Sequence, residues 1–128
     1  MEIYSRNRLY VSGDEQDLIK KIPVILAGSG IGSNIAECAL RFGFENLTIV
    51  DGDCVEVSNL NRQNYIYEDV SKYKTESLFK RLKHINPNAE IKFITDFISD
   101  DNLDDLLSEQ VIAINALDFT TDIPVKFD

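Results

Sequence analysis

A short apolar run, Val24 to Ala27, leads directly into the small-residue loop Gly28 to Ser33, and a helical pattern begins within that loop. Small residues let the backbone approach a phosphate closely, and a helix N-terminus offers N–H groups with a partial positive charge. A strand, a glycine loop and a helix in this order favour a site for a phosphate-bearing nucleotide. The same loop is also compatible with tight packing of a helix on a sheet, so this motif does not establish the site alone.

The rest of the chain alternates between β-rich runs and helical patterns. The β-rich runs are Val24 to Ala27, Leu47 to Val50, Ile91 to Ile94 and Val111 to Asn115. Alternating strands and helices of this length are typical of a parallel sheet covered on both faces. The predicted fold class is therefore α/β, with a Rossmann-like, mainly parallel sheet and helices on both faces.

Three helices are expected between these strands. In the first, Ile31, Ile35, Ala39 and Phe42 recur at helical spacing, and Gly43 is placed to end the helix in a left-handed conformation. The second covers Lys72 to His84, with an inward stripe at Leu78, Leu82 and Ile85 before Asn86-Pro87. The third begins at Ser99 as the N-cap, with Leu103, Leu106 and Leu107 facing inward.

Length and composition predict one compact unit. With 128 residues and 44% hydrophobic content, the chain can form one domain with a core. We expect residues 1–20 to form an N-terminal arm or helix and residues 21–128 to form a Rossmann-like ATP-binding domain. The chain has no apolar stretch near the roughly 18 residues that span a bilayer, and its start lacks the apolar core of a secretory signal. These features predict a cytoplasmic protein with no membrane partner.

Charge and metal-ligating residues exclude two further classes of function. The net charge of -9 argues against nucleic-acid binding, because such proteins normally carry a positive field. The two cysteines, Cys38 and Cys54, are too far apart for a CxxC unit, and His84 is the one histidine. A zinc cluster is therefore not expected. We interpret both cysteines as small packing residues, with Cys38 near the buried face of its helix.

Asp51 follows the second strand, a little over twenty residues beyond the glycine loop. A carboxylate at this place can accept hydrogen bonds from ribose hydroxyls. A solvated acid at a strand end is the simpler interpretation of Asp51 alone, and the preceding glycine loop makes nucleotide binding the better one. The pair does not distinguish a nicotinamide cofactor from ATP.

A long polar stretch follows Asp51, where an ordinary Rossmann domain would begin its next helix. Its motif has the form D-x-D-x-V followed by S-N-L-x-R-Q, carried by Asp51, Asp53, Val55, Ser58, Asn59, Leu60, Arg62 and Gln63. Lys74 follows a dozen residues later, and Tyr4-Ser5-Arg6, Asn86-Pro87 and Asp118 extend the match over nearly the whole chain. In these residues the sequence resembles the ThiF/MoeB/HesA family of adenylyltransferases, which are similar to ubiquitin-activating enzymes.

The resemblance implies ATP-dependent adenylation of a carboxylate, commonly the C-terminal glycine of a ubiquitin-like or sulfur-carrier protein. It assigns catalytic roles to Arg62 and Lys74, which would neutralise phosphate charge, and to Arg6, which would reach into the site of a second subunit in a homodimer. Asp118 would hold Mg²⁺. The remaining nucleotide-binding residues would be Gly28, Gly30, Gly32, Asp51, Asp53, Asn59 and Gln63.

Other interpretations of these residues stay open. Arg62 and Lys74 are compatible with ordinary surface cations, Asp118 with a capped turn, and Arg6 with a surface ion pair. Two other functions are an NAD-binding Rossmann oxidoreductase or sensor, which leaves S-N-L-x-R-Q unexplained, and a noncatalytic partner subunit. Retention of Arg62, Lys74 and Asp118 argues against the latter.

The sequence departs from the family pattern in the glycine loop, after the fourth strand and in length. Ala27 and Ser29 stand where the family usually has glycines, and the Ser29 hydroxyl would either crowd the phosphates or add a hydrogen bond. Phe119 replaces a common asparagine, and Asn115 stands where aspartate is frequent. Family members continue past this length, so we expect a truncated or short form with an incomplete sheet, and adenylation by this chain alone is an open question.

Overall fold

The computed structural model describes residues 3–108, 112–117 and 127 of the chain. A four-stranded sheet lies at its centre, with the order β3-β2-β1-β4 and every pairing parallel. The strands are β1 (Val24–Ala27), β2 (Asn46–Val50), β3 (Glu90–Ile94) and β4 (Ile112–Asn115). The strand order reverses between β1 and β4. The predicted α/β class and parallel sheet are confirmed.

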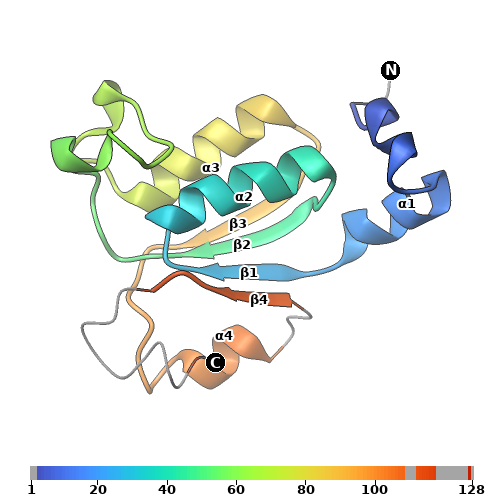
Figure 1. The fold of residues 1–128 in the computed structure, drawn as a ribbon. Helices are drawn as coiled ribbons and strands as arrows, with labels where there is room; N and C mark the ends of the chain where they lie inside the picture. Colours follow the sequence, from blue (N-terminus) through green and yellow to red (C-terminus); the bar gives the residue numbers. More distant parts are fainter. Residues whose placement is uncertain (1–2, 109–111, 118–126, 128) are drawn as a thin grey trace.

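Helices cover both faces of this sheet (Figure 1). On one face lie α2 (Ile31–Phe42) and α3 (Lys74–Ile85), which pack on alternate strand residues such as Leu26, Leu47 and Ile49. On the other face lies α4 (Leu103–Leu107), whose leucines pack against Ile25, Ala27 and Val50. The alternation arises because successive strand side chains point to opposite faces. Each face therefore has its own apolar layer.

The helix ends agree with the turn signals in the sequence. Gly43 follows α2 with a φ of 127°, and its N–H donates to the carbonyls of Ala39 and Leu40. Leu78 and Leu82 on α3 are fully buried, as the predicted stripe requires. In α2 the buried positions are instead Gly32, Ser33, Ala36 and Leu40, and Ile31 is 64% exposed. The inward face of α2 therefore runs through Ala36 and Leu40, and Ile31 lies outside it.

The third helix begins later than expected. Asn102, not Ser99, precedes α4, and residues 100–102 form a turn. The Asn102 Oδ1 accepts a hydrogen bond from the Ser99 N–H, and the Ser99 carbonyl accepts from the N–H groups of Asn102 and Leu103. An asparagine side chain that bonds local backbone in this way favours a turn over a helix. The inward orientation of Leu103, Leu106 and Leu107 is nevertheless confirmed.

The N-terminal residues form a short arm at the end of the sheet where the strands begin. The arm contains η1 (Ser5–Leu9) and α1 (Gly13–Lys21), and it contacts the C-terminal ends of α2 and α3. Ser12 and Glu15 close a reciprocal capping box at the start of α1. No helix within the described ranges is long and apolar enough to cross a membrane.

Candidate functional site

A cavity of about 640 Å³ lies at the carboxyl ends of all four strands. It includes the place where the strand order reverses, which is where open α/β sheets bind ligands. Its lining includes most of the predicted site residues: Gly28, Gly30, Asp51, Asp53, Asn59, Arg62, Gln63 and Lys74. The fold therefore brings together positions that are up to 46 residues apart along the chain, from Gly28 to Lys74.

The glycine loop has two different functions at this cavity. Gly28 has a φ of +93°, and a Cβ there would lie 2.4 Å from the Ala116 carbonyl oxygen, so this position requires glycine. A Cβ at Gly30 would lie 3.1 Å from the Gln63 amide nitrogen at the cavity wall. Gly32 is not part of the lining and lies against the Ala116 side chain instead. Gly32 therefore supports the packing of α2, as the simpler interpretation of the loop supposed.

The Asp51 carboxylate is fixed by three hydrogen bonds. Its Oδ2 accepts from the Ser29 N–H at 2.7 Å and from the Ser29 hydroxyl at 2.9 Å. Its Oδ1 accepts from the Asp53 N–H at 2.8 Å. Ser29 is fully buried and does not line the cavity, so its hydroxyl adds a hydrogen bond and does not crowd the cavity.

Tyr65 supports this arrangement by binding the backbone of Ser29, and it is not among the predicted site residues. Its hydroxyl donates a hydrogen bond to the Ser29 carbonyl, and the side chain is only 6% exposed. Burial raises the pKa of the Tyr65 hydroxyl far above its usual range, so it remains a proton donor at neutral pH. A buried tyrosine two residues beyond the S-N-L-x-R-Q motif has no pattern that marks it.

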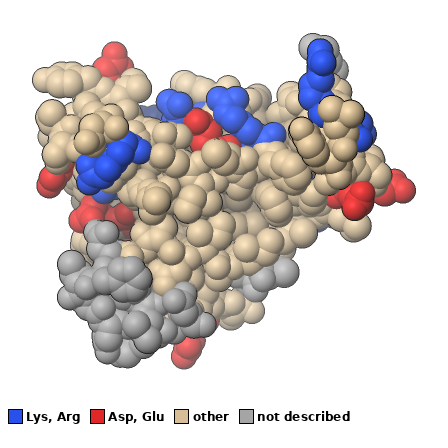
Figure 2. Space-filling model, viewed as in Figure 1, with Lys and Arg blue, Asp and Glu red and all other residues tan. Residues whose placement is uncertain are grey.

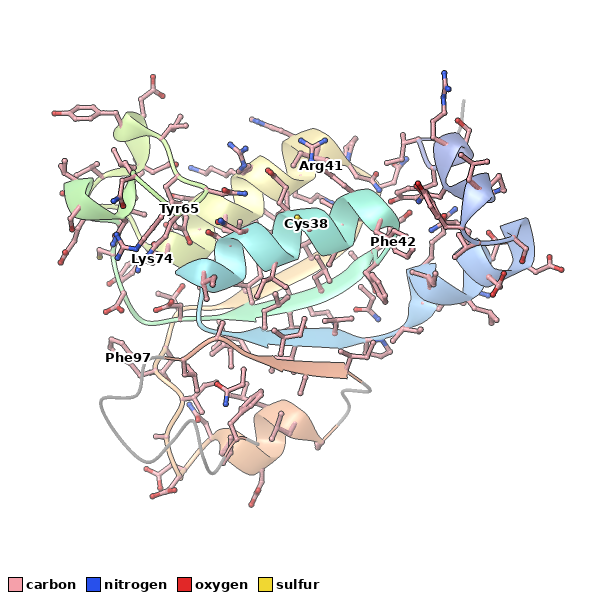
Figure 3. The ribbon with its side chains drawn as sticks, viewed as in Figure 1. Cys38, Arg41, Phe42, Tyr65, Lys74 and Phe97 are labelled. Carbon is pink, nitrogen blue, oxygen red and sulfur yellow. The ribbon has the colours of Figure 1, made fainter. Side chains whose placement is uncertain are left out.

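The two predicted cations are placed differently at the cavity. Lys74, the first residue of α3, is only 7% exposed, and its backbone N–H donates to the Asp53 carbonyl. Its ammonium makes no hydrogen bond or ion pair with the part of the chain that the structure describes. Arg62 is exposed, and its guanidinium donates to the Ser58 carbonyl and to the Asn61 side chain. Figure 3 shows Lys74 and Tyr65 at the same end of the sheet.

Two amides line the cavity beside these cations. The Asn59 Oδ1 accepts from the Glu56 N–H, which closes the short helix η2 (Val57–Asn59). The Gln63 Oε1 is buried and has no hydrogen-bond partner among the described residues. A buried polar atom without a partner is costly in a folded protein. The Gln63 Oε1 is therefore available to accept a hydrogen bond from a ligand, whereas the Asn59 Oδ1 already accepts one from the backbone.

The loop after β3 also contributes to the cavity, through Asp96, Phe97 and Ile98. Phe97 is 61% exposed, and its ring packs on the Cα of Gly52, where a Cβ would lie 2.6 Å from the ring carbons. None of these three residues is among the predicted site residues, because no motif marks the loop after β3. All four parallel strands end at the same edge, so the loop after Ile94 belongs to the same set.

The remaining residues that the sequence singled out are Arg6, Asp118 and the two cysteines. Arg6 lies in η1 at the far end of the sheet and does not line the cavity of its own chain. Asp118 lies outside the described residues. Both Cys38 and Cys54 are exposed, so the interpretation of the two as packing residues is wrong. Cys38 is exposed because the inward face of α2 passes through Ala36 and Leu40. Cys54 lines the cavity.

The parallel sheet and the cavity at its switch point define a Rossmann-like α/β domain. The ThiF family pattern matches residues 4–125, and the chain belongs to this family. The chain is 35% identical to the tRNA threonylcarbamoyladenosine dehydratase of Haemophilus influenzae over 79% of its length and 39% of that protein. It is 31% identical to the sulfur carrier protein ThiS adenylyltransferase of Bacillus subtilis, over 90% of this chain and 36% of that one.

Solved structures show the same fold. The Escherichia coli tRNA N6-threonylcarbamoyladenosine dehydratase in complex with ATP superimposes with a TM-score of 0.83 at 31% identity, covering 88% of this chain and 47% of that one. The E. coli protein MccB with ATP has a TM-score of 0.82 at 28% identity, covering 95% of this chain and 38% of that one. The chain thus spans less than half the length of these relatives.

Proposed function

We propose that the cavity binds ATP and that the protein uses it to adenylate a carboxylate. The observation that carries this proposal is Lys74, a residue that lines the cavity and is only 7% exposed, and whose ammonium forms no ion pair with the described residues. A buried charge without a partner is strongly unfavourable, so such a site favours an anionic ligand. The two relatives crystallised with ATP support the choice of nucleotide.

The residues around the cavity divide into a ribose end and a phosphate end. Asp51, fixed by Ser29 and Asp53, offers an acceptor for a ribose hydroxyl. Lys74 and Arg62 supply positive charge, and the guanidinium can bind two phosphate oxygens at once. The N-terminus of α2 adds the partial positive charge of a helix end beside Gly30. These contributions offset the negative charge of the protein as a whole.

In the proposed reaction the substrate carboxylate attacks the α-phosphorus of ATP in line. A carboxyl oxygen–phosphorus bond forms, the bond between the α-phosphorus and the bridging oxygen breaks, and the electron pair leaves with pyrophosphate. The protein supplies no covalent nucleophile in this step. Its contribution is to orient the triphosphate and to neutralise the charge that develops on the phosphates, through Lys74, Arg62 and Gln63.

The proposal includes Mg²⁺, which neutralises phosphate charge when it is bound to ATP. Magnesium usually takes one or two carboxylates together with phosphate oxygens. The described part of the cavity offers Asp53 and Asp96 as oxygen donors, and no three potential metal ligands gather in the described ranges. This donor set fits a magnesium ion that is held mainly by the nucleotide, and we retain Asp118 as the predicted protein ligand.

For the substrate we favour the C-terminal carboxylate of a ubiquitin-like or sulfur-carrier protein. The ThiS adenylyltransferase among the relatives supports this class, and the tRNA dehydratases favour a tRNA substrate instead. The net charge of -9 argues against tRNA, and the basic side chains in Figure 2 lie at separate places on the face shown, not in one patch. We keep the protein carrier as the proposal, in the cytoplasm, with tRNA as the second candidate.

We also propose that the working form is a homodimer in which Arg6 serves the cavity of the partner. Arg6 is exposed and lies at the opposite end of the sheet from its own cavity, so it can contribute only to another copy. Mixing Arg6→Ala with Lys74→Ala tests this idea, because a mixed dimer regains one cavity with both cations. Activity of the mixture above that of either variant is expected, and no gain would refute it.

The direct test of the proposed function compares nucleotides and then substrates. ATP should bind in the presence of Mg²⁺, and Arg62→Ala should weaken it about tenfold or more through the loss of a charge-assisted contact. Binding of NAD but not of ATP would favour the oxidoreductase or sensor.

ATP–pyrophosphate exchange that requires a carrier protein is the expected activity. Exchange that requires tRNA would select the second candidate, and ATP binding without exchange for any substrate would indicate a noncatalytic subunit.

A further inference from the structure

Ser29 of the glycine loop donates hydrogen bonds to the Asp51 carboxylate, and these reduce the number of hydrogen bonds that Asp51 can accept from a ligand. A carboxylate has two oxygens with about four lone-pair positions. In Asp51 both positions of Oδ2 are filled by the N–H and hydroxyl of Ser29, and one position of Oδ1 is filled by the Asp53 N–H. About one acceptor position, on Oδ1, therefore remains for a ligand in the cavity.

Ser29 is held firmly in this arrangement. It is fully buried, its carbonyl accepts the hydroxyl of the buried Tyr65, and neither residue lines the cavity. The Ser29 hydroxyl is therefore committed to Asp51 and is not offered to a ligand. A satisfied buried network of this kind is rigid, because each member restricts the next.

We propose that Ser29 is a specificity-determining residue that blocks one acceptor position of Asp51, so that the nucleotide is recognised through a single ribose hydroxyl. Tyr65 is a positioning residue that holds Ser29 in place for this purpose. The proposal rests on the proposed function, since it requires a ribose at Asp51. It goes beyond that function because it states which ribose contacts the site makes and which residue limits them.

The proposal predicts an asymmetry between two ATP analogues. In the natural protein, the deoxy-ATP that lacks the bound hydroxyl binds about tenfold weaker than ATP, because a hydrogen bond to a charged group is lost. The analogue that lacks the other hydroxyl binds about as well as ATP. In Ser29→Ala the loss of the buried hydroxyl leaves Oδ2 a vacant position and opens the cavity wall beside it, so both ribose hydroxyls are bound and both analogues bind about tenfold weaker than ATP.

The experiment measures the dissociation constants of ATP, 2′-deoxy-ATP and 3′-deoxy-ATP for the full chain. The variants are Ser29→Ala, Ser29→Gly and Tyr65→Phe, and Ser33→Ala is the matched control. Ser33 is also fully buried in this loop, but its hydroxyl bonds the Gly30 carbonyl and the Asn64 N–H and makes no bond to Asp51. The asymmetry should persist in Ser33→Ala, diminish in Tyr65→Phe and disappear in both Ser29 variants.

Each contrary result has a separate meaning. Equal losses for the two analogues in the natural protein would overturn the proposal, since Asp51 would then bind both hydroxyls or neither. An asymmetry that survives in Ser29→Ala and Ser29→Gly would also overturn it. Failure of the natural protein to bind ATP at all would refute the proposed function itself. Ser29→Gly keeps the test decisive if Ser29→Ala does not fold.

Discussion

The two ends of the sheet both bury polar side chains, but they satisfy them differently. At the arm end, the fully buried Gln16 donates to the Phe42 carbonyl and accepts from Asn7. The Asn7 amide also reaches the Phe42 carbonyl, and the Tyr4 hydroxyl bonds Asn86. Phe42 in Figure 3 marks this end, opposite Lys74 and Phe97.

At the cavity end, two polar groups that line the cavity lack such partners among the described residues. They are the buried Gln63 Oε1 and the ammonium of Lys74, a residue that is only 7% exposed. A further buried atom without a partner among these residues, the Ser77 Oγ of α3, does not line the cavity. A network that satisfies itself stabilises the fold, whereas a group left without a partner costs stability unless a ligand completes it. The comparison indicates that the arm end serves the fold and the cavity end serves a ligand.

Matched glycine variants at the two ends should give the largest effect. Gly43→Ala places a Cβ 1.9 Å from the Gln16 amide at a φ of +127°, and Gly28→Ala places one 2.4 Å from the Ala116 carbonyl at +93°. Each should lower the free energy of unfolding by about 3 kcal/mol. Urea denaturation measures this. The folded fraction of Gly43→Ala should keep its affinity for ATP, and that of Gly28→Ala should lose it. Equal ATP affinities in the two variants would contradict the difference between the two ends.

A pair of glutamine variants sharpens the contrast. Gln16→Ala should lower the free energy of unfolding by about 2 kcal/mol, because it removes two buried hydrogen bonds. Gln63→Ala should change it by less than about 0.5 kcal/mol, since the Gln63 Oε1 has no partner to lose among the described residues. Chemical denaturation of both variants is the measurement. A larger cost at Gln63 would show that it serves the fold after all.

The capping box at the start of α1 belongs to the arm end and should have a smaller effect. Ser12→Ala removes the side chain that accepts from the Glu15 N–H, and it should lower the free energy of unfolding by about 1 kcal/mol. ATP affinity should not change, because α1 lies away from the cavity. A change in ATP affinity comparable to that of a cavity variant would contradict the separation of the two ends.

The pH dependence of the same capping box gives the smallest effect. The hydrogen bonds from the Ser12 N–H and hydroxyl lower the pKa of the Glu15 carboxyl below 4.5. A lowered folded pKa means that the carboxylate stabilises the fold above pH 4.5 and that this contribution is lost as the pH falls through the lower folded value. The stability difference between the natural protein and Glu15→Gln should therefore shrink on acidification. A difference that is constant from pH 7 to pH 3 would contradict this assignment.

The sequence was sufficient to predict most of the fold, because the signals were local and repeated. The apolar run ending at Ala27 and the glycine after α2 have single physical explanations, burial in a parallel sheet and a left-handed backbone. The start of α4 was predicted wrongly because Asn102 competes for the backbone as effectively as Ser99 does. The buried face of α2 was not predicted, because helical spacing alone does not fix which face turns inward.

The candidate site was predictable only in part. A linear motif marks Asp51, Arg62 and Lys74, and the fold brings them to one cavity. Tyr65 acts through a hydrogen bond to a residue 36 positions away, which no local pattern encodes. Phe97 enters the cavity because its strand ends at the common edge, so it follows from topology and not from a motif. Contacts that depend on tertiary structure are the ones that the sequence did not show.

The central claim is that Lys74 is buried for a ligand, and one pair of titrations tests it most directly. Lys74→Met keeps the length of the side chain and removes its charge, so unfolding in the absence of ATP should cost the same free energy or more, and ATP should bind about thirtyfold more weakly. The matched variant Lys20→Met removes an arm-end ammonium that lies 5.7 Å from the centre of the Tyr4 ring. It should slightly destabilise the fold and leave ATP binding unchanged. Equal ATP affinity in the natural protein and Lys74→Met would contradict the account.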